Sequence, residues 1–193
     1  MAERAGAHWG PEKREITIVG YDPAWPATFR RHAERVTRAL GATALDIEHI
    51  GSTSVPDLAA KPIVDMLVVV PDAADEDAYR PQFEAAGYVL RVREPEFEQH
   101  RMFRTPERDV HVHVFSAGSR EGARLLTFRD RLRTHPHDRQ RYEDTKRELA
   151  TRSWPDMNAY AQAKTDVIEA ILAHAAAAHS AAADARRSAD SPP

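Results

Sequence analysis

The stretch His49–Val70, HIGSTSVPDLAAKPIVDMLVVV, joins two strand-like runs through a loop that is suited to an anion. The loop begins with Gly51–Thr53, a tight turn that can offer backbone amides and hydroxyls, and Lys61 follows as a cation. The second run is apolar except for one charge, Asp65. A carboxylate in such a strand is costly to bury unless it is paired, solvated at the end of the sheet or bound to a cation. The stretch therefore favours a phosphate and metal site, and a solvated Asp65 at a strand end is the alternative.

The composition is that of an ordinary globular protein. The chain has 193 residues, of which 42% are hydrophobic and 30% charged, and its formal net charge is -3. This length suits one well-packed domain, or one domain with a helical extension. The small negative charge argues against an extended contact with DNA or RNA, so we expect no nucleic-acid partner.

The chain lacks cysteine and contains ten histidines. The absence of cysteine excludes disulfides, thiolate nucleophiles and cysteine-type zinc sites, and it fits a reducing compartment. No run of about 18 apolar residues is present, and the first residues lack the apolar core of a secretory signal. We therefore expect a cytoplasmic protein with no membrane partner, in which histidines are candidate metal ligands.

Apolar periodicity divides the first part of the chain into short strands and two helices. Trp25, Phe29, Val36 and Leu40 recur at helical spacing before Gly41, which predicts a helix, and a second helix is predicted at residues 71–87. Strands are predicted at residues 16–19, 45–50, 63–70, 88–92, 101–105 and 109–115, with a hairpin loop at 93–100. These elements predict a mixed α/β (α+β) core at residues 15–118, after a flexible leader at 1–14.

The composition changes after Gly118, and only helical patterns follow. Three apolar stripes at helical spacing predict a three-helix unit at residues 119–175. Pro136 and Pro155 mark the breaks between these helices, because proline disfavours helix in the residue before it. Residues 176–193 are rich in alanine and then in serine and proline, which predicts a fraying helix end and a disordered tail.

Four blocks of this sequence resemble, in the same order, the GrpB family of the nucleotidyltransferase fold superfamily. They are HIGSTSVPDLAAKPIVDMLVVV, HVHVF, FRDRLRTHPHDRQRYEDTKRELA and YAQAKTDVIEAIL, and the likeness spans residues 15–175. The resemblance implies a nucleotidyltransferase-like central mixed sheet, with the helical unit covering a ligand cleft. Some members of the family are fused to dephospho-CoA kinase, which implies adenine nucleotide or coenzyme A chemistry.

The signature of that superfamily is a Gly-Ser turn, a strand with Asp-x-Asp, and a third carboxylate on a later strand. This chain keeps the turn and Asp65, but Leu67 stands where the second carboxylate is expected. His111 and His113 occupy the later strand, and their spacing of two places both on one face. The trio of carboxylates thus becomes one carboxylate with two imidazoles.

Asp65, His111 and His113 are therefore the candidate catalytic and metal-binding residues, with His49 as a candidate fourth ligand. The expected cofactor is a divalent metal, Mg²⁺, Mn²⁺ or Zn²⁺, and imidazole suits zinc or another transition metal better than magnesium. Two alternatives stay open. The histidines are half-buried strand residues bonded to backbone or to Glu48, or they contact a phosphate directly without a metal.

The candidate nucleotide- or phosphate-binding residues are Gly51, Ser52, Thr53, Lys61, Arg129, Lys146 and Lys164. In the loop, amides, hydroxyls and a cation can hold phosphate oxygens, although Ser52 and Thr53 could instead simply cap a short helix. In the helical unit, a tyrosine four residues before a lysine shares its helix face and can stack on a base. The alternative for these cations is that they extend from amphipathic helix edges into solvent.

The leading hypothesis is a nucleotide-dependent transferase, with ATP as the expected nucleotide and an unknown small molecule as acceptor. Catalysis would rest on positioning and charge neutralisation rather than on a covalent intermediate. One alternative is a non-catalytic module that holds a nucleotide or a coenzyme A-like molecule, because Leu67 marks lost chemistry. Another is a metal-dependent hydrolase that uses Asp65, His111 and His113.

Overall fold

The structure of the chain is a computed structural model that describes the backbone of residues 15–189 and the side chains of residues 15–177. The leader expected at residues 1–14 and residues 190–193 of the expected tail lie outside the described residues.

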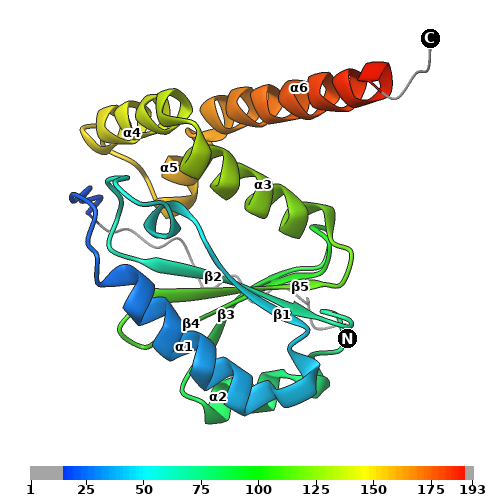
Figure 1. The fold of residues 1–193 in the computed structure, drawn as a ribbon. Helices are drawn as coiled ribbons and strands as arrows, with labels where there is room; N and C mark the ends of the chain where they lie inside the picture. The colour runs from blue at the N-terminus through cyan, green and yellow to red at the C-terminus, as the bar shows by residue number, and fades with distance from the viewer. Residues whose placement is uncertain (1–14, 190–193) are drawn as a thin grey trace.

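Within the described residues, one mixed sheet of five strands forms the centre of the molecule (Figure 1). The strands are β1 (Asp46–Ile50), β2 (Val64–Val70), β3 (Val89–Glu94), β4 (His100–Arg104) and β5 (Val110–Ser116). Their order across the sheet is β1-β2-β5-β4-β3; β2 and β5 pair in parallel, and the other neighbours pair antiparallel. The mixed sheet with its helices confirms the α+β fold class expected from the sequence.

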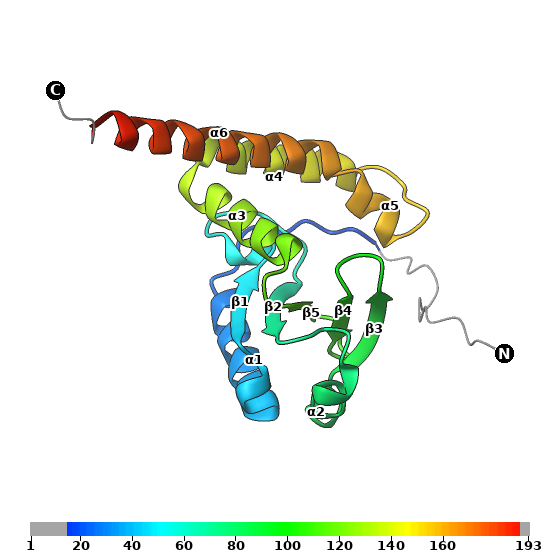
Figure 2. The same cartoon turned by 90° about the vertical axis from the view of Figure 1, so that its right-hand side faces the viewer.

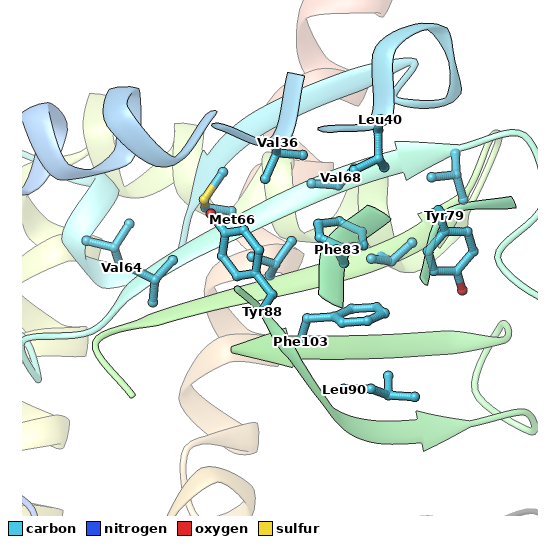
Figure 3. Packing of buried hydrophobic residues seen from close by; sticks show 14 of the residues in the cluster. Val36, Leu40, Val64, Met66, Val68, Tyr79, Phe83, Tyr88, Leu90 and Phe103 are labelled. Atoms are coloured by element: carbon cyan, nitrogen blue, oxygen red, sulfur yellow. The ribbon is translucent and has the colours of Figure 1, made fainter. Parts of the chain in front are cut away.

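Helices α1 (Trp25–Leu40) and α2 (Arg80–Ala85) cover one face of the sheet (Figures 1 and 2). Alternation along β2 sends Val64, Met66 and Val68 to this face, because successive strand residues point to opposite sides. There they form the main hydrophobic core with apolar residues of α1 and with a group of aromatic rings, shown in Figure 3: Val36, Leu40, Tyr79, Phe83, Tyr88 and Phe103.

The other face of the sheet lies under the carboxyl-terminal helices, as Figure 2 shows from the end of the strands. They are α3 (Arg120–Thr134), α4 (Pro136–Ala150), α5 (Met157–Gln162) and α6 (Thr165–Ala189). The odd residues of β2 point to this side: Leu67 is buried in a small apolar cluster, in which Leu125 of α3 packs against it. This alternation places Asp65 on the same side, beneath the helices.

The helical unit differs from the expected three helices in two ways. The third stripe is divided between α5 and α6, because Asp156 caps a separate short helix by accepting a hydrogen bond from the Ala159 amide, and that helix ends at Gln162. In addition, α6 continues to Ala189, past the expected boundary at residue 175. Alanine has the highest helix propensity, and the alanine-rich sequence after residue 175 continues the helix.

Two elements of the core are shorter than expected. The strand predicted at residues 16–19 is reduced to an isolated bridge between Val19 and Ala60. The helix predicted at residues 71–87 begins only at Arg80, after the short 3₁₀ turn η3 (Glu76–Ala78). The next residue, Pro81, lies in the first turn of α2, a position that proline favours.

Among the described residues, no helix combines the length and the apolar character that crossing a bilayer requires.

Candidate functional site

A cavity of about 710 Å³ lies between the sheet and the helical unit. Its walls come from the Gly51-Ser52 turn, from β2, β4 and β5, and from α4 and α5. Asp65, His111 and His113 line it on the sheet, and Lys146 lines it on α4. The volume falls in the range of sites for small molecules, about 300–1,000 Å³.

The structure brings Asp65, His111 and His113 together in this cavity. In the parallel register of β2 and β5, Asp65 lies beside His111 and Leu67 lies beside His113, so the three polar side chains share one face. Oδ1 of Asp65 is 3.4 Å from Nδ1 of His111 and 3.6 Å from Nε2 of His113. Two ligand atoms bound tetrahedrally at about 2.1 Å from a zinc ion are about 3.4 Å apart. The spacing of the three groups therefore fits a transition metal ion.

Asp65 is held in its ionised form. Burial alone would raise its pKa, but hydrogen bonding and charge from the two imidazoles lower the pKa well below its usual range. Its other oxygen, Oδ2, lies against Gly51, where an added Cβ would be only 2.5 Å away. Gly51 also has φ +69° and ψ -176°, a conformation that is essentially restricted to glycine. The glycine thus lets the turn approach the carboxylate closely.

His49 does not join this group, and its assignment as a metal ligand is corrected. It pairs with Met66 across β1 and β2, so it points to the α1 face, away from Asp65. Its Nε2 is 3.1 Å from Oγ1 of Thr53, and its ring stacks on Phe29 with centroids 4.7 Å apart. Burial lowers the pKa of His49 to about 4. Thr53, also buried, is thereby engaged with His49 and does not line the cavity, unlike Gly51 and Ser52.

Arg129 is likewise misassigned as a phosphate ligand. Its guanidinium is buried between α3 and β1, where NH1 donates to Oε2 of Glu48 and to the His49 carbonyl, and Nε donates to Oδ1 of Asp130. It does not line the cavity. Arg129 instead fastens α3 to the sheet.

The lysines Lys61, Lys146 and Lys164 do line the cavity. Nζ of Lys61 and Nζ of Lys164 lie 5.1 Å and 5.0 Å from the centroid of the Tyr160 ring. Lys146 lies over the ring of Tyr142, with its Nζ 4.8 Å from the centroid. These positions surround the cavity with cations held on aromatic faces, an arrangement that attracts anions.

Lys146 is the most buried of these cations, at 2% exposure. Its Nζ donates to Oγ of Ser52 at 3.1 Å and to the Ala59 carbonyl. Burial, with the charge of Lys164 as the next contribution, lowers the pKa of Lys146 to about 7. Burial also lowers the pKa of Lys164. Both ammonium groups would therefore be stabilised by an anion entering the cavity.

Tyr160 has an unused polar group at this site. The residue is 1% exposed, and its hydroxyl has no hydrogen-bond partner among the described residues, while its ring lines the cavity. Burial raises the pKa of the hydroxyl to about 12, so it remains a donor. An unsatisfied buried donor is costly, which makes it a candidate contact for a ligand.

His100 and Glu94 were not identified from the sequence, because residues 93–100 were expected to form a loop. In the structure Glu94 ends β3 and His100 begins β4. Nε2 of His100 lies 3.0 Å from Nδ1 of His113, and Nδ1 of His100 lies 2.7 Å from Oε2 of Glu94. Burial and then the charge of His113 lower the pKa of His100 to about 4. His113 is therefore in contact with His100, which in turn contacts Glu94.

Comparisons with known proteins agree on one family. The family model described as GrpB protein matches residues 15–174. A UPF0157 protein of Halalkalibacterium halodurans is 48% identical over 165 residues, which cover 86% of this chain and 85% of that protein. The crystal structure of the conserved protein GrpB from Enterococcus faecalis has a TM-score of 0.73 and 35% identity, covering 82% of this chain and 96% of that one. A dephospho-CoA kinase of Mycolicibacterium paratuberculosis is 29% identical over 175 residues, 77% of this chain and 43% of the kinase.

Proposed function

The chain belongs to the GrpB family, and we propose that it is a nucleotide-dependent transferase whose cavity holds a divalent cation and the phosphates of a nucleotide such as ATP. Asp65, His111 and His113 would hold the cation. Lys61, Lys146 and Lys164 would hold the phosphates.

The observation that carries this proposal is the presence of both charge types in one cavity. Asp65 touches the backbone of Gly51, and the adjacent Ser52 accepts a hydrogen bond from Lys146. Burial lowers the pKa of Lys164, and the negative charge of Asp65 partly offsets this lowering. The ionised carboxylate of Asp65 is thus connected to the buried ammonium group of Lys146 through the Gly51-Ser52 turn. A ligand that satisfies both must combine anionic oxygens with a cation, as a metal-bound polyphosphate does.

The residues of the cavity can perform specific parts of phosphoryl or nucleotidyl transfer. The lysines neutralise phosphate charge, Tyr160 offers a hydroxyl donor, and Tyr142 and Tyr160 offer aromatic faces near the cations. A bound divalent cation would supply further charge neutralisation and orient the phosphates. Because no group of the cavity needs to form a bond with the ligand, catalysis would rest on positioning and preorganised charge.

The relative that is named a dephospho-CoA kinase supports the class of ligand. A segment similar to this chain forms part of that protein, whose name gives dephospho-CoA as its substrate. An adenine nucleotide or a coenzyme A-like molecule is therefore the first ligand to test.

A non-catalytic binding module is the second candidate, and Leu67 favours it. Leu67 occupies the position of the second carboxylate in the nucleotidyltransferase pattern, and it is 1% exposed beneath α3. Its Cδ2 lies 3.9 Å from the point where a Cβ on Gly122 would stand. This position is closed by packing, so no second carboxylate is available there to hold a second cation.

Isothermal titration with ATP in the presence of Mn²⁺ tests ligand binding. We expect binding that is lost in Asp65→Asn and weakened about 10-fold or more in Lys164→Gln, because a charge-assisted hydrogen bond contributes about 1.5–3 kcal/mol. Arg38→Gln is the matched control, since Arg38 lies on the exposed side of α1 with 72% side-chain exposure. Failure of ATP to bind, or equal affinity in Asp65→Asn and the wild type, would overturn the proposal.

Incubation with labelled ATP and a metabolite extract separates the two candidates. A transferred phosphoryl or nucleotidyl group on any acceptor, absent in Asp65→Asn, would establish a transferase and exclude the pure binding module. Binding of ATP without any labelled product would favour the binding module. Hydrolysed ATP without a labelled acceptor would favour the metal-dependent hydrolase.

A further inference from the structure

We propose that Glu94 and His100 are positioning residues that present Nε2 of His113 as a metal ligand, and that they thereby make the cation site prefer a Zn²⁺-like transition metal to Mg²⁺. The inference rests on the proposed function, because it concerns the same cation site. It assigns a role to two residues that do not touch Asp65.

The geometry forms a continuous line of polar contacts. Oε2 of Glu94 is 2.7 Å from Nδ1 of His100, Nε2 of His100 is 3.0 Å from Nδ1 of His113, and Nε2 of His113 is 3.6 Å from Oδ1 of Asp65. The two rings are nearly parallel, with planes 12° apart and centroids 5.2 Å apart. Since the facing nitrogens are much closer than the centroids, the rings lie edge to edge, as a hydrogen bond between them requires.

The direction of each hydrogen bond follows from counting protons. Glu94 is a carboxylate and can only accept, so Nδ1 of His100 donates to it. A metal on Nε2 of His113 leaves that ring one N–H, on Nδ1, so His113 donates and Nε2 of His100 accepts. His100 is 7% exposed and its ring stacks on Phe115 with centroids 4.7 Å apart, so packing holds it against His113.

Because Nδ1 of His113 is engaged by His100, Nε2 is the nitrogen that faces the cavity, 3.6 Å from Oδ1 of Asp65. A cation between these two atoms would bind both a ring nitrogen and a carboxylate oxygen.

The same order of donors indicates which metal fits. Ligating histidines commonly donate their second ring nitrogen to a further polar group, which fixes the tautomer and raises the basicity of the ligand. Neutral imidazole nitrogens suit Zn²⁺ and related transition metals, whereas Mg²⁺ prefers oxygen ligands and retains its waters. His111 supplies a second imidazole nitrogen, so the site offers two nitrogens and one carboxylate.

The hydrogen bond is tested first in the Zn²⁺-loaded protein, by long-range ¹H–¹⁵N NMR of the histidine rings. We expect Nε2 of His113 to bind the metal and Nδ1 to carry a proton that is protected from exchange with water. In His100→Phe, which keeps an aromatic ring against Phe115 but removes the acceptor, we expect that proton to exchange faster. Metal on Nδ1 of His113, or unchanged exchange in His100→Phe, would overturn the inference.

Metal binding is tested with Zn²⁺ and Mg²⁺ against a chromophoric chelator. We expect Zn²⁺ to bind more tightly than Mg²⁺, and His100→Phe to weaken Zn²⁺ binding about 10- to 100-fold, the usual effect of removing such a partner. Glu94→Gln should weaken it less, and it provides the test if His100→Phe does not fold. His137→Gln, which removes an exposed histidine of α4, should change nothing.

These readouts separate the inference from the proposed function. If Zn²⁺ binds and Asp65→Asn abolishes binding, while His100→Phe and Glu94→Gln bind like the wild type, the inference alone is overturned. If neither metal binds the wild type, the cation site of the proposed function fails and so does the metal preference.

Discussion

Replacement of Gly51 by alanine tests the closest contact of the site. The new Cβ would lie 2.5 Å from Oδ2 of Asp65 and 3.1 Å from its Cγ, so the carboxylate must move. The backbone at φ +69° and ψ -176° adds strain of about 1–3 kcal/mol for a residue with a Cβ. We therefore expect Gly51→Ala to lower the free energy of unfolding by about 2 kcal/mol, or the melting temperature by about 4–8 °C. We also expect a large loss of metal affinity.

Gly87→Ala is the matched control for this experiment. Gly87 has φ +86°, and nothing lies within 4 Å of its added Cβ, so the substitution strains the backbone without moving a side chain of the site. Its free energy of unfolding should fall by about 1–2 kcal/mol, and its melting temperature with it. Its metal affinity should stay at the wild-type value. Denaturant unfolding and a chelator competition assay, applied to both variants, measure the two effects. Wild-type metal affinity in a folded Gly51→Ala would refute the reasoning.

Three further outcomes follow from buried polar groups. Tyr160→Phe removes an unpartnered buried hydroxyl, so thermal melting should show a protein that is more stable by about 1 kcal/mol, and titration should show weaker ATP binding. Unchanged affinity would exclude a contact between that hydroxyl and ATP. The pKa of Lys146 falls from 10.5 to about 7 on folding, so between these pH values the unfolded chain binds more protons and stability rises with pH. Urea unfolding at several pH values should show a shallower rise in Lys146→Met, and an equal rise in the variant and the wild type would contradict the shift. His49→Gln should retain wild-type Zn²⁺ affinity in the chelator assay while His111→Gln loses it, because His111 faces Asp65 and His49 points to the other face of the sheet. Equal losses would contradict the placement of His49.

The sequence was sufficient to predict the central group of the site. The alternation in HVHVF places His111 and His113 on one face, and an isolated charge in an apolar strand marks Asp65. The sequence did not reveal that β2 and β5 are adjacent and parallel, and this register brings the three residues together. Strand pairing joins segments that are distant in the chain, so no local pattern encodes it.

The predictions from the sequence that were wrong have the same physical origin. His49 lies beside the correct turn, but the antiparallel register of β1 and β2 places Ile50 opposite Asp65, and His49 consequently points the other way. Arg129 lies in α3, and only the position of that helix over β1 shows that its partner is Glu48. His100 was placed in a loop because strand ends are poorly marked by composition. In each case a tertiary contact determines the role of the side chain.

The central claim is that one cavity binds a cation on the sheet and phosphates on the lysines. A crystal structure of the protein soaked with ATP and Mn²⁺, with anomalous data for manganese, tests it directly. We predict an anomalous peak within coordination distance of Asp65, His111 and His113, with phosphate density between that peak and Lys61, Lys146 and Lys164. Manganese elsewhere, or phosphates bound away from these lysines, would contradict the account.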